Sequence, residues 1–194
     1  MEIPLFLLHT VLHSGGRLSL RVFEPRYMDM VKDCLRTNRP FGVCLIEQGE
    51  EVATPAAGAA TPYRVGTLAQ IADWDMPQLG ILNIVAHGGQ RFRILSQTTR
   101  PNQLVCAEVA LLDEPPALPI PQDYARLVPM LRALIEALED KPPEPYRFYD
   151  AAWVANRWAE MLPFSLPRQQ QILELDDGVA RLDAIYRFLE QEAE

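Results

Sequence analysis

The stretch RLSLRVFEPRY, residues 17–27, changes from the periodicity of a strand to that of a helix. Apolar and polar side chains alternate from Arg17 to Val22, which predicts a half-buried β-strand. Pro25 follows where proline is tolerated, in the first turn of a helix. The apolar residues that follow recur at intervals of three and four, as on one face of a helix: Tyr27, Met30, Val31, Cys34 and Leu35. The stretch therefore predicts a strand that leads directly into an amphipathic helix.

The rest of the first half is rich in short apolar runs bounded by Gly, Pro, Asn or Asp. Runs of strand length occupy residues 5–8, 41–46, 65–71, 79–85, 91–94 and 104–111. His87 is followed by two glycines, which predicts a turn between the fourth and fifth of these runs. About seven strands at this spacing predict a small barrel or curled sheet with one inserted helix.

The second half is rich in proline and predicts helices. EPPALPIP, residues 114–121, predicts a stiff connector because its prolines forbid a helix. We therefore expect a β-rich unit over residues 1–114, a connector over 115–121 and a helical unit over 122–194.

Four helices are expected in that unit. The first follows a stripe from Tyr124 to Leu138, where Pro129 either starts the regular helix or kinks it. The second has Asp150 as its N-cap and ends at Leu162, with Trp153 and Trp158 mostly in the core. The others lie after Pro167 and between residues 179 and 189. The fold class is α+β, with a barrel followed by a helical bundle.

Composition excludes several functional classes. The chain of 194 residues carries a net charge of −8, which argues against a broad contact with nucleic acid or an anionic membrane. The longest uncharged stretches, residues 3–16 and 52–63, are too short and too polar to span a bilayer. No secretory signal is recognisable, and three cysteines without CxxC spacing suit a reducing compartment, so we expect a cytoplasmic protein.

Motifs for catalysis are absent from the sequence. The two lysines, Lys32 and Lys141, do not follow a glycine, so there is no phosphate-binding loop of the GxxxxGK type. There is no GxSxG motif either. We expect no enzyme, no cofactor and no metal. A thiol hydrolase is the alternative that the sequence leaves open, although Cys34, Cys44 and Cys106 fall on apolar stripes or alternating strands typical of buried, inert thiols.

Histidines and arginines are weaker indications of a functional site. His9 and His13 are four residues apart but fall in a strand and turn, so we interpret them as two partly exposed histidines rather than metal ligands. Arg91, Arg93 and Arg100 accompany Phe92, a combination that can contact nucleic acid. The competing interpretation, which the near-neutral local charge favours, is the solvated face of a strand.

Two aromatic residues are candidates for an exposed contact. Trp74 stands between two aspartates where we expect a strand to meet a turn, and Tyr63 lies at the base of a segment, residues 52–62, whose composition predicts a mobile loop. The capping of a barrel end is the competing role for Trp74.

Together the motifs resemble the N-terminal, substrate-binding domain of the Lon protease family. The similar segments are IPLFLL (3–8), FEPRY (23–27), RPFGV (39–43), VGTLAQI (65–71), GQRFRI (89–94), WAEMLP (158–163) and RQQQILE (168–174). The resemblance covers nearly the whole chain and implies a PUA-like β pseudo-barrel followed by a helical part. It also implies a stand-alone member that lacks the ATPase and peptidase modules.

The resemblance implies a non-catalytic module that binds apolar segments of unfolded proteins or docks to a protease or other protein partner. Candidate contact residues are Val52, Tyr63, Trp74, Met76 and Leu79. FEPRY itself is expected to be architectural, with Glu24 at the helix start and Tyr27 on the core face. The alternative function is RNA binding by a PUA-like domain, and the oligomeric state is left open.

Overall fold

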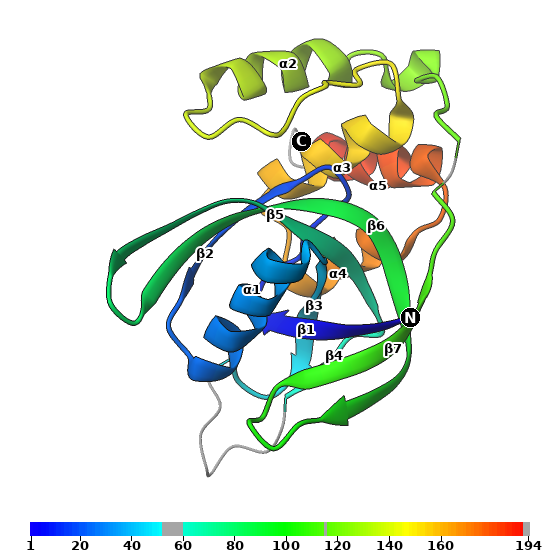
Figure 1. The fold of residues 1–194 in the computed structure, drawn as a ribbon. Coiled ribbons are helices and arrows are strands. Elements are labelled where there is room, and N and C mark those ends of the chain that lie inside the picture. Colours follow the sequence, from blue (N-terminus) through cyan, green and yellow to red (C-terminus); the bar gives the residue numbers. More distant parts are fainter. Residues whose placement is uncertain (52–59, 115, 192–194) are drawn as a thin grey trace.

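The computed structural model describes residues 1–51, 60–114 and 116–191. Its β-rich part is built from seven strands (Figure 1). These are β1 (Glu2–Leu8), β2 (Arg17–Val22), β3 (Phe41–Gln48), β4 (Thr61–Pro62), β5 (Val65–Gln78), β6 (Ile81–Thr99) and β7 (Val105–Leu111).

Five of these strands close into a barrel. The sheet order is β1-β7-β6-β5-β3-β4, and a parallel pairing of β1 with β3, from Leu5 opposite Gly42 to Leu8 opposite Leu45, joins the ends of the ring. Strand β2 adds to β6, and the short strand β4, which the sequence did not predict, adds to β3. The expected α+β pseudo-barrel is therefore confirmed.

Strand β1 is buried on both faces, as expected for an apolar run without alternation. Ile3, Leu5 and Leu7 pack in one cluster with side chains of β3, β6 and β7. Phe6 and Leu8 pack in a second cluster, which includes the buried side chains of the inserted helix. The sheet is thus sandwiched between the barrel core and this helix.

The inserted helix α1 (Pro25–Thr37) begins at the predicted proline. FEPRY fixes it to the barrel: the Tyr27 ring stacks on Phe6 at 3.9 Å, and its hydroxyl accepts a hydrogen bond from the amide of Leu7. Arg26 donates to the carbonyl oxygens of Glu51 (2.7 Å) and Gln103 (3.0 Å) and to the Glu24 carboxylate. The motif therefore tethers one helix to three separate chain segments, in line with its expected architectural role.

Strand β6 is continuous, so the predicted turn at His87 is wrong. Gly88 instead allows the segment before β2 to approach the sheet. The Gly88 amide donates to Gly16 O at 2.9 Å, and the Gly15 amide donates to Gly88 O at 2.8 Å. A Cβ on Gly88 would overlap the carbonyl oxygen of His13. Close backbone approach, rather than chain reversal, requires glycine here.

The hairpin between β5 and β6 also reverses later than expected. Strand β5 continues past Ile71 to Gln78, so Trp74 lies inside a strand rather than at its end. Leu79, expected to start the next strand, lies in the turn together with Gly80, whose φ of 87° favours glycine.

The helical part consists of η1 (Gln122–Tyr124), α2 (Leu127–Ala137), α3 (Ala151–Met161), α4 (Leu166–Glu174) and α5 (Gly178–Gln191). Asp150 caps α3 as predicted, because its carboxylate accepts a hydrogen bond from the amide of Ala152. Pro129 lies in the first turn of α2. Trp153 and Trp158 are buried in the core of this part, as predicted.

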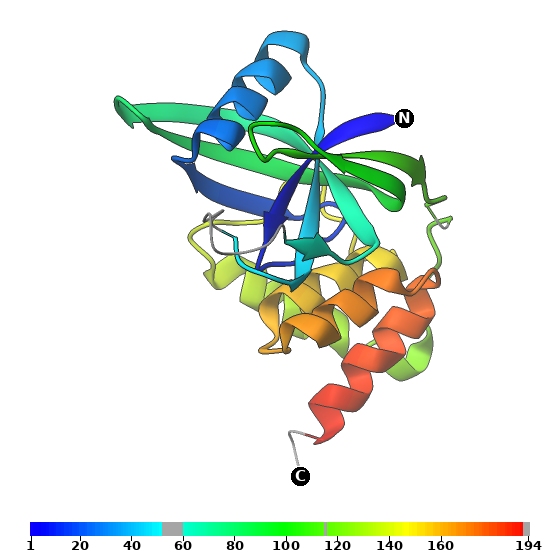
Figure 2. The ribbon, with the colours of Figure 1, turned by 90° about the horizontal axis from the view of Figure 1, so that it is seen from below.

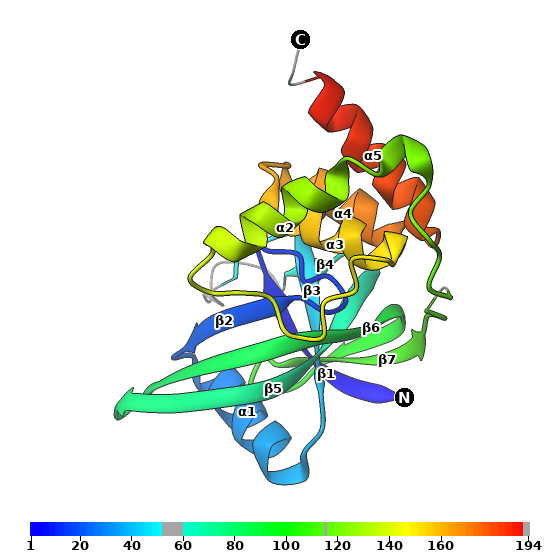
Figure 3. The ribbon, with the colours of Figure 1, turned by 90° about the horizontal axis from the view of Figure 1, so that it is seen from above.

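Helices α2 to α5 cover one side of the barrel, α1 lies on a different side, and the long β5–β6 hairpin projects away from the barrel (Figures 1, 2 and 3). None of the helices in the described ranges is long and apolar enough to cross a bilayer.

We predict that Gly88→Ala lowers the free energy of unfolding by about 2 kcal/mol or more, because its methyl group must displace the backbone near His13. Urea unfolding measures the change. Gly89→Ala is the matched control: the nearest atom to its added Cβ is 3.5 Å away, so its effect stays within about 0.5 kcal/mol. Equal effects of the two substitutions would contradict this packing.

Candidate functional site

The outer part of the β5–β6 hairpin, residues 71–86, is the candidate binding surface, and we call it the arm. Strand β3 pairs with β5 only at Thr67–Ala69, so β5 has a free edge along the arm. On the other side β2 pairs with β6 from Leu82 to His87. The arm is therefore a three-stranded sheet with β5 outermost (Figure 3).

Three large apolar side chains of the arm are exposed. Trp74 is 54% exposed, Met76 is 40% exposed and Leu79, at the turn, is 97% exposed. Three of the five predicted contact residues therefore gather at the arm. When such side chains bind a partner, they lose no internal packing, and their apolar area is removed from water.

Trp74 extends an apolar face that begins in the core. It lies directly opposite Ile84 in the β5–β6 ladder, and paired residues project from the same face of a sheet. Ile84 is buried in the cluster that includes α1. The exposed indole thus continues that face beyond the part that the core covers.

The other two predicted contact residues are placed differently. Tyr63 is half-buried and packs against Val11, Leu45, Val65 and Leu173, at the junction with α4. Val52 lies outside the described residues, as does most of the low-complexity segment. The structure therefore gathers Trp74, Met76 and Leu79 but does not bring Tyr63 to them.

The basic group around Phe92 is divided by the fold. Arg91 is fully buried, so its interpretation as part of a solvated strand face is wrong. Arg93 and Arg100 are exposed, and Arg100 lies 3.4 Å from the carboxylate of Glu2. Because Arg91 is inaccessible and Arg100 is paired, the three arginines do not form a common surface for RNA.

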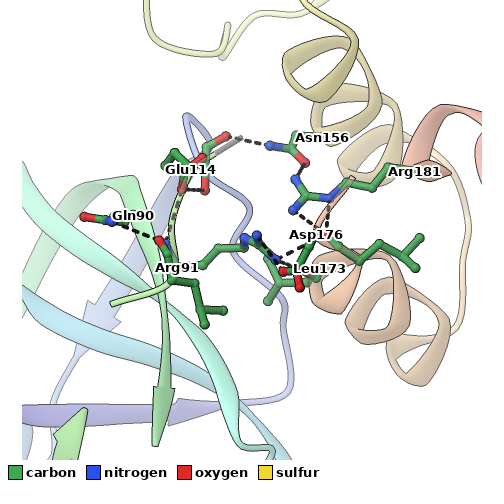
Figure 4. Close-up of polar contacts among 10 residues, drawn as sticks. Gln90, Arg91, Glu114, Asn156, Leu173, Asp176 and Arg181 are labelled. Carbon is green, nitrogen blue, oxygen red and sulfur yellow. Dashed lines mark hydrogen bonds and ion pairs between the residues drawn. The ribbon is translucent and has the colours of Figure 1, made fainter. Parts of the chain in front are cut away.

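Arg91 instead joins the barrel to the helical part. Its guanidinium donates to the carbonyl oxygens of Leu173 (2.8 Å) and Leu175 (3.2 Å) and to the Asp176 carboxylate (3.1 Å). These acceptors lie at the C-terminal end of α4, where the helix dipole favours a cation. Figure 4 shows the side chain reaching from β6 toward this helix end.

Two more arginines complete what we call the arginine joint, which consists of Arg91, Arg157 and Arg181. Arg157, on α3, donates to the carbonyl oxygens of Ser14 (3.0 Å) and Gly15 (2.5 Å), so it reaches toward the barrel. Arg181, on α5, donates to Leu175 O and to the Asn156 side chain (Figure 4). Burial and the charge of Arg91 lower the pKa of Arg181 to about 10, which leaves it charged at neutral pH.

His13 lies beside this joint and is fully buried, so the expectation of a partly exposed side chain is wrong. Among the residues that the structure describes, neither ring nitrogen has a hydrogen-bond partner. Burial, together with the charges of Arg157, Arg181 and Arg91, lowers the pKa of His13 to about 3. The imidazole is therefore neutral at physiological pH.

The cysteines are buried, as predicted. Burial raises the pKa of Cys34 to about 11 and also raises the pKa of Cys44 and Cys106. The groups are protonated thiols at neutral pH, which disfavours the thiol-hydrolase alternative. No cluster of three metal-ligating side chains occurs in the described ranges.

One hollow was not expected from the sequence: a groove of about 600 Å³ between the start of β1 and the end of α1. Its floor is apolar, with Ile3, Met30 and Leu104, and arginines 36, 39 and 100 stand at its rim. These residues come from separate segments and share no motif, so only the fold reveals their proximity.

A family model described as the ATP-dependent protease La (LON) substrate-binding domain matches residues 2–191. The chain belongs to this family. It is 28% identical to the Lon protease of Phenylobacterium zucineum and 27% identical to that of Methylocella silvestris, each over 192 residues. Both matches cover 95% of this chain but only 24% and 23% of the relatives, so the chain spans about a quarter of their length.

Solved structures of Lon N-terminal domains have the same fold. A Lon N-terminal domain protein from Xanthomonas campestris is 33% identical, with a TM-score of 0.77 over 96% of this chain and 98% of the other. The N-terminal domain of a Mycobacterium avium complex Lon protease has a TM-score of 0.62 at 14% identity, over 95% and 96% of the two chains. The second likeness shows the fold alone.

We predict that Arg91→Met lowers the free energy of unfolding by about 2 kcal/mol, since the buried carbonyl oxygen of Leu173 loses its donor and the contacts to Leu175 O and the exposed Asp176 carboxylate are lost as well. Urea unfolding followed by circular dichroism measures the loss. Arg93→Met, two residues along the same strand and exposed, is the control and is expected to be nearly neutral. A small effect at Arg91 would show that the joint contributes little to stability.

A second prediction concerns pH. The pKa of His13 is about 3 in the folded chain, but close to 6.5 once unfolded, so below pH 6.5 only the unfolded state takes up this proton. Stability is therefore lost as pH falls, by about 1 kcal/mol from this group between pH 7 and pH 5.5.

Replacement of this histidine tests the assignment. His13→Leu is expected to remove this part of the pH dependence of urea unfolding, whereas His9→Leu, at an exposed position, leaves it unchanged. If the free energy of unfolding of the His13 variant depended on pH as that of the unchanged chain does, the burial of a neutral imidazole would be contradicted.

Proposed function

We propose that the domain binds exposed apolar segments of unfolded proteins at the arm and presents them to a protease partner, without catalysis of its own. The exposed apolar side chains of Trp74, Met76 and Leu79 carry this proposal. The substrate-binding name of the family supports it. Apolar contact suits unfolded chains, because a folded protein keeps most such side chains inside.

The shape of the arm favours recognition through side chains rather than through strand addition. The pairing of β5 with β6 shifts register between Ile71 and Asp73 and again between Asp75 and Gln78. Bulges and charges along an edge oppose the pairing of a further strand. Contact through side chains tolerates many sequences, which suits a module that samples unfolded proteins.

The negative charge of the arm favours partners that carry positive charge. Asp73 and Asp75, both exposed, are the sequence neighbours of Trp74 in β5 and project from the other face of the arm. Opposite charges across a contact raise the rate of association and favour one class of partner. We therefore propose that apolar segments with neighbouring Lys or Arg bind better than segments with neighbouring Asp or Glu.

The test is a titration with a permanently unfolded protein, such as reduced and carboxymethylated lactalbumin, with native lactalbumin as the negative probe. Trp74→Ala is expected to weaken binding at least about fivefold, because a central aromatic contact is lost. Because Trp74 is half exposed, the variant keeps its unfolding midpoint.

Tyr149→Ala is the matched control, since Tyr149 is an exposed aromatic residue of the helical part. It is expected to bind as the unchanged domain does. Equal affinity of the Trp74 variant and the unchanged domain, or equal weakening by both substitutions, would overturn the assignment of the arm.

A further inference from the structure

The groove between the start of β1 and the end of α1 is a recess of the surface that lies apart from the arm. Its volume of about 600 Å³ is within the range of sites that bind small ligands, about 300–1,000 Å³. The start of β1 and the end of α1 lie on the side of the barrel that faces away from helices α2 to α5, and the tip of the arm projects in a different direction (Figures 2 and 3). A ligand in the groove therefore leaves the arm free.

The floor of the groove is apolar and is held by the barrel. Its side chains are each at most 5% exposed and belong to the two core clusters of the barrel: Ile3, Met30, Cys34 and Leu104. A floor of this kind favours apolar side chains of a ligand, because they leave water when they bind.

The rim of the groove carries three arginines and two carboxylates. Arg36 pairs with Asp33 at 2.9 Å. Arg100 pairs with Glu2 at 3.4 Å. Arg39, also exposed, forms no ion pair with any residue that the structure describes. The side chains of the rim therefore have an excess of one positive charge, on a chain whose net charge is −8.

The end of α1 fixes the backbone at Arg39. The amides of Asn38 and Arg39 both donate to Cys34 O, and Asn38 is left-handed, with a φ of 51°. The Asn38 side chain also accepts a hydrogen bond from the Gln70 side chain, on β5, at 3.0 Å. Arg39 is thus held at the rim, where its guanidinium can form charge-assisted hydrogen bonds with an anion.

We propose that the groove binds the C-terminal end of a polypeptide, with its last apolar side chains on the floor and its carboxylate on Arg39. A guanidinium and a carboxylate match each other in shape and often form two parallel hydrogen bonds. One unpaired cation beside an apolar floor fits a ligand that has one terminal carboxylate and an apolar body.

The polar groups of the rim favour a peptide over a hydrocarbon acid. Glu2 and Asp33 provide acceptors for the N–H groups of a peptide. Arg36 and Arg100 provide donors for its carbonyl oxygens. A hydrocarbon chain makes neither contact, and a cationic ligand meets the positive excess of the rim. The site is independent of the arm, because it reads the end of a chain rather than an internal apolar segment.

The test is a titration of the whole chain with a fluorescent hexapeptide that ends in Ala-Leu-Leu, with either a free or an amidated C-terminus. The free acid is expected to bind at least about fivefold more tightly than the amide, because only the acid pairs with Arg39. Equal affinity of the two peptides, or no binding of the acid up to about 1 mM, would overturn the proposal.

Arg39→Gln tests which residue makes the contact. This variant is expected to bind the acid and the amide equally, whereas Arg93→Gln, at an exposed position of β6 outside the groove, keeps the preference for the acid. Because both arginines are exposed, both variants are expected to keep their unfolding midpoint. A preference that persists in the Arg39 variant, or disappears in the Arg93 variant, would contradict the assignment of the groove.

Two further measurements separate the groove from the arm and from a site for free acids. Trp74→Ala is expected to leave the affinity for the free-acid peptide unchanged, and a loss would place this binding at the arm instead. Octanoate is expected to displace the peptide only at concentrations well above the dissociation constant of the peptide. Displacement at or below that concentration would show that the groove takes a hydrocarbon acid rather than a peptide end.

Discussion

The burial of Arg91 is the constraint on which the arrangement of the molecule depends. A guanidinium cannot be deprotonated at neutral pH, so its removal from water requires acceptors for its N–H groups. The barrel supplies the arginine, and the end of α4 supplies two carbonyl oxygens and a carboxylate. These contacts therefore tie β6 to the end of α4.

Arg157 connects the same two parts in the opposite direction, from a helix to the barrel, and so stabilises the same interface. It extends from α3 to the carbonyl oxygens of Ser14 and Gly15, in the segment that packs on Gly88. Burial, together with the charges of the neighbouring arginines, keeps His13 neutral and lowers the pKa of Arg181. A joint of this kind orients the helical part on the barrel rather than adding a large net stability, because the cost of desolvating the arginines opposes the hydrogen bonds that they form.

The joint also gives the arm a rigid base. Strand β6 carries Arg91 and then, toward its start, the part of the sheet that forms the arm. Anchoring β6 under the helices therefore fixes the direction in which the arm projects.

Local sequence determined the elements of this protein. The proline of FEPRY and the carboxylate of Asp150 set helix starts through contacts within one turn, and period-two alternation set β2 and β7. Even the exposed Trp74 was recognisable from its two acidic neighbours. These features depend on residues close in sequence, which is why the sequence alone revealed them.

Tertiary structure decided which side chains the fold buries and which segments meet. Arg91 and Arg93 occupy equivalent positions in the alternating pattern of the strand sequence. Only Arg91, however, contacts the end of α4, a helix about eighty residues away. His13 and Gly88 were misplaced for the same reason, because their environments come from segments that approach only in the folded chain. The sequence by itself thus determined most of the strands, the main helices and the family, whereas long-range packing decided the course of β5 and β6, the arginine joint and the separation of Tyr63 from the arm.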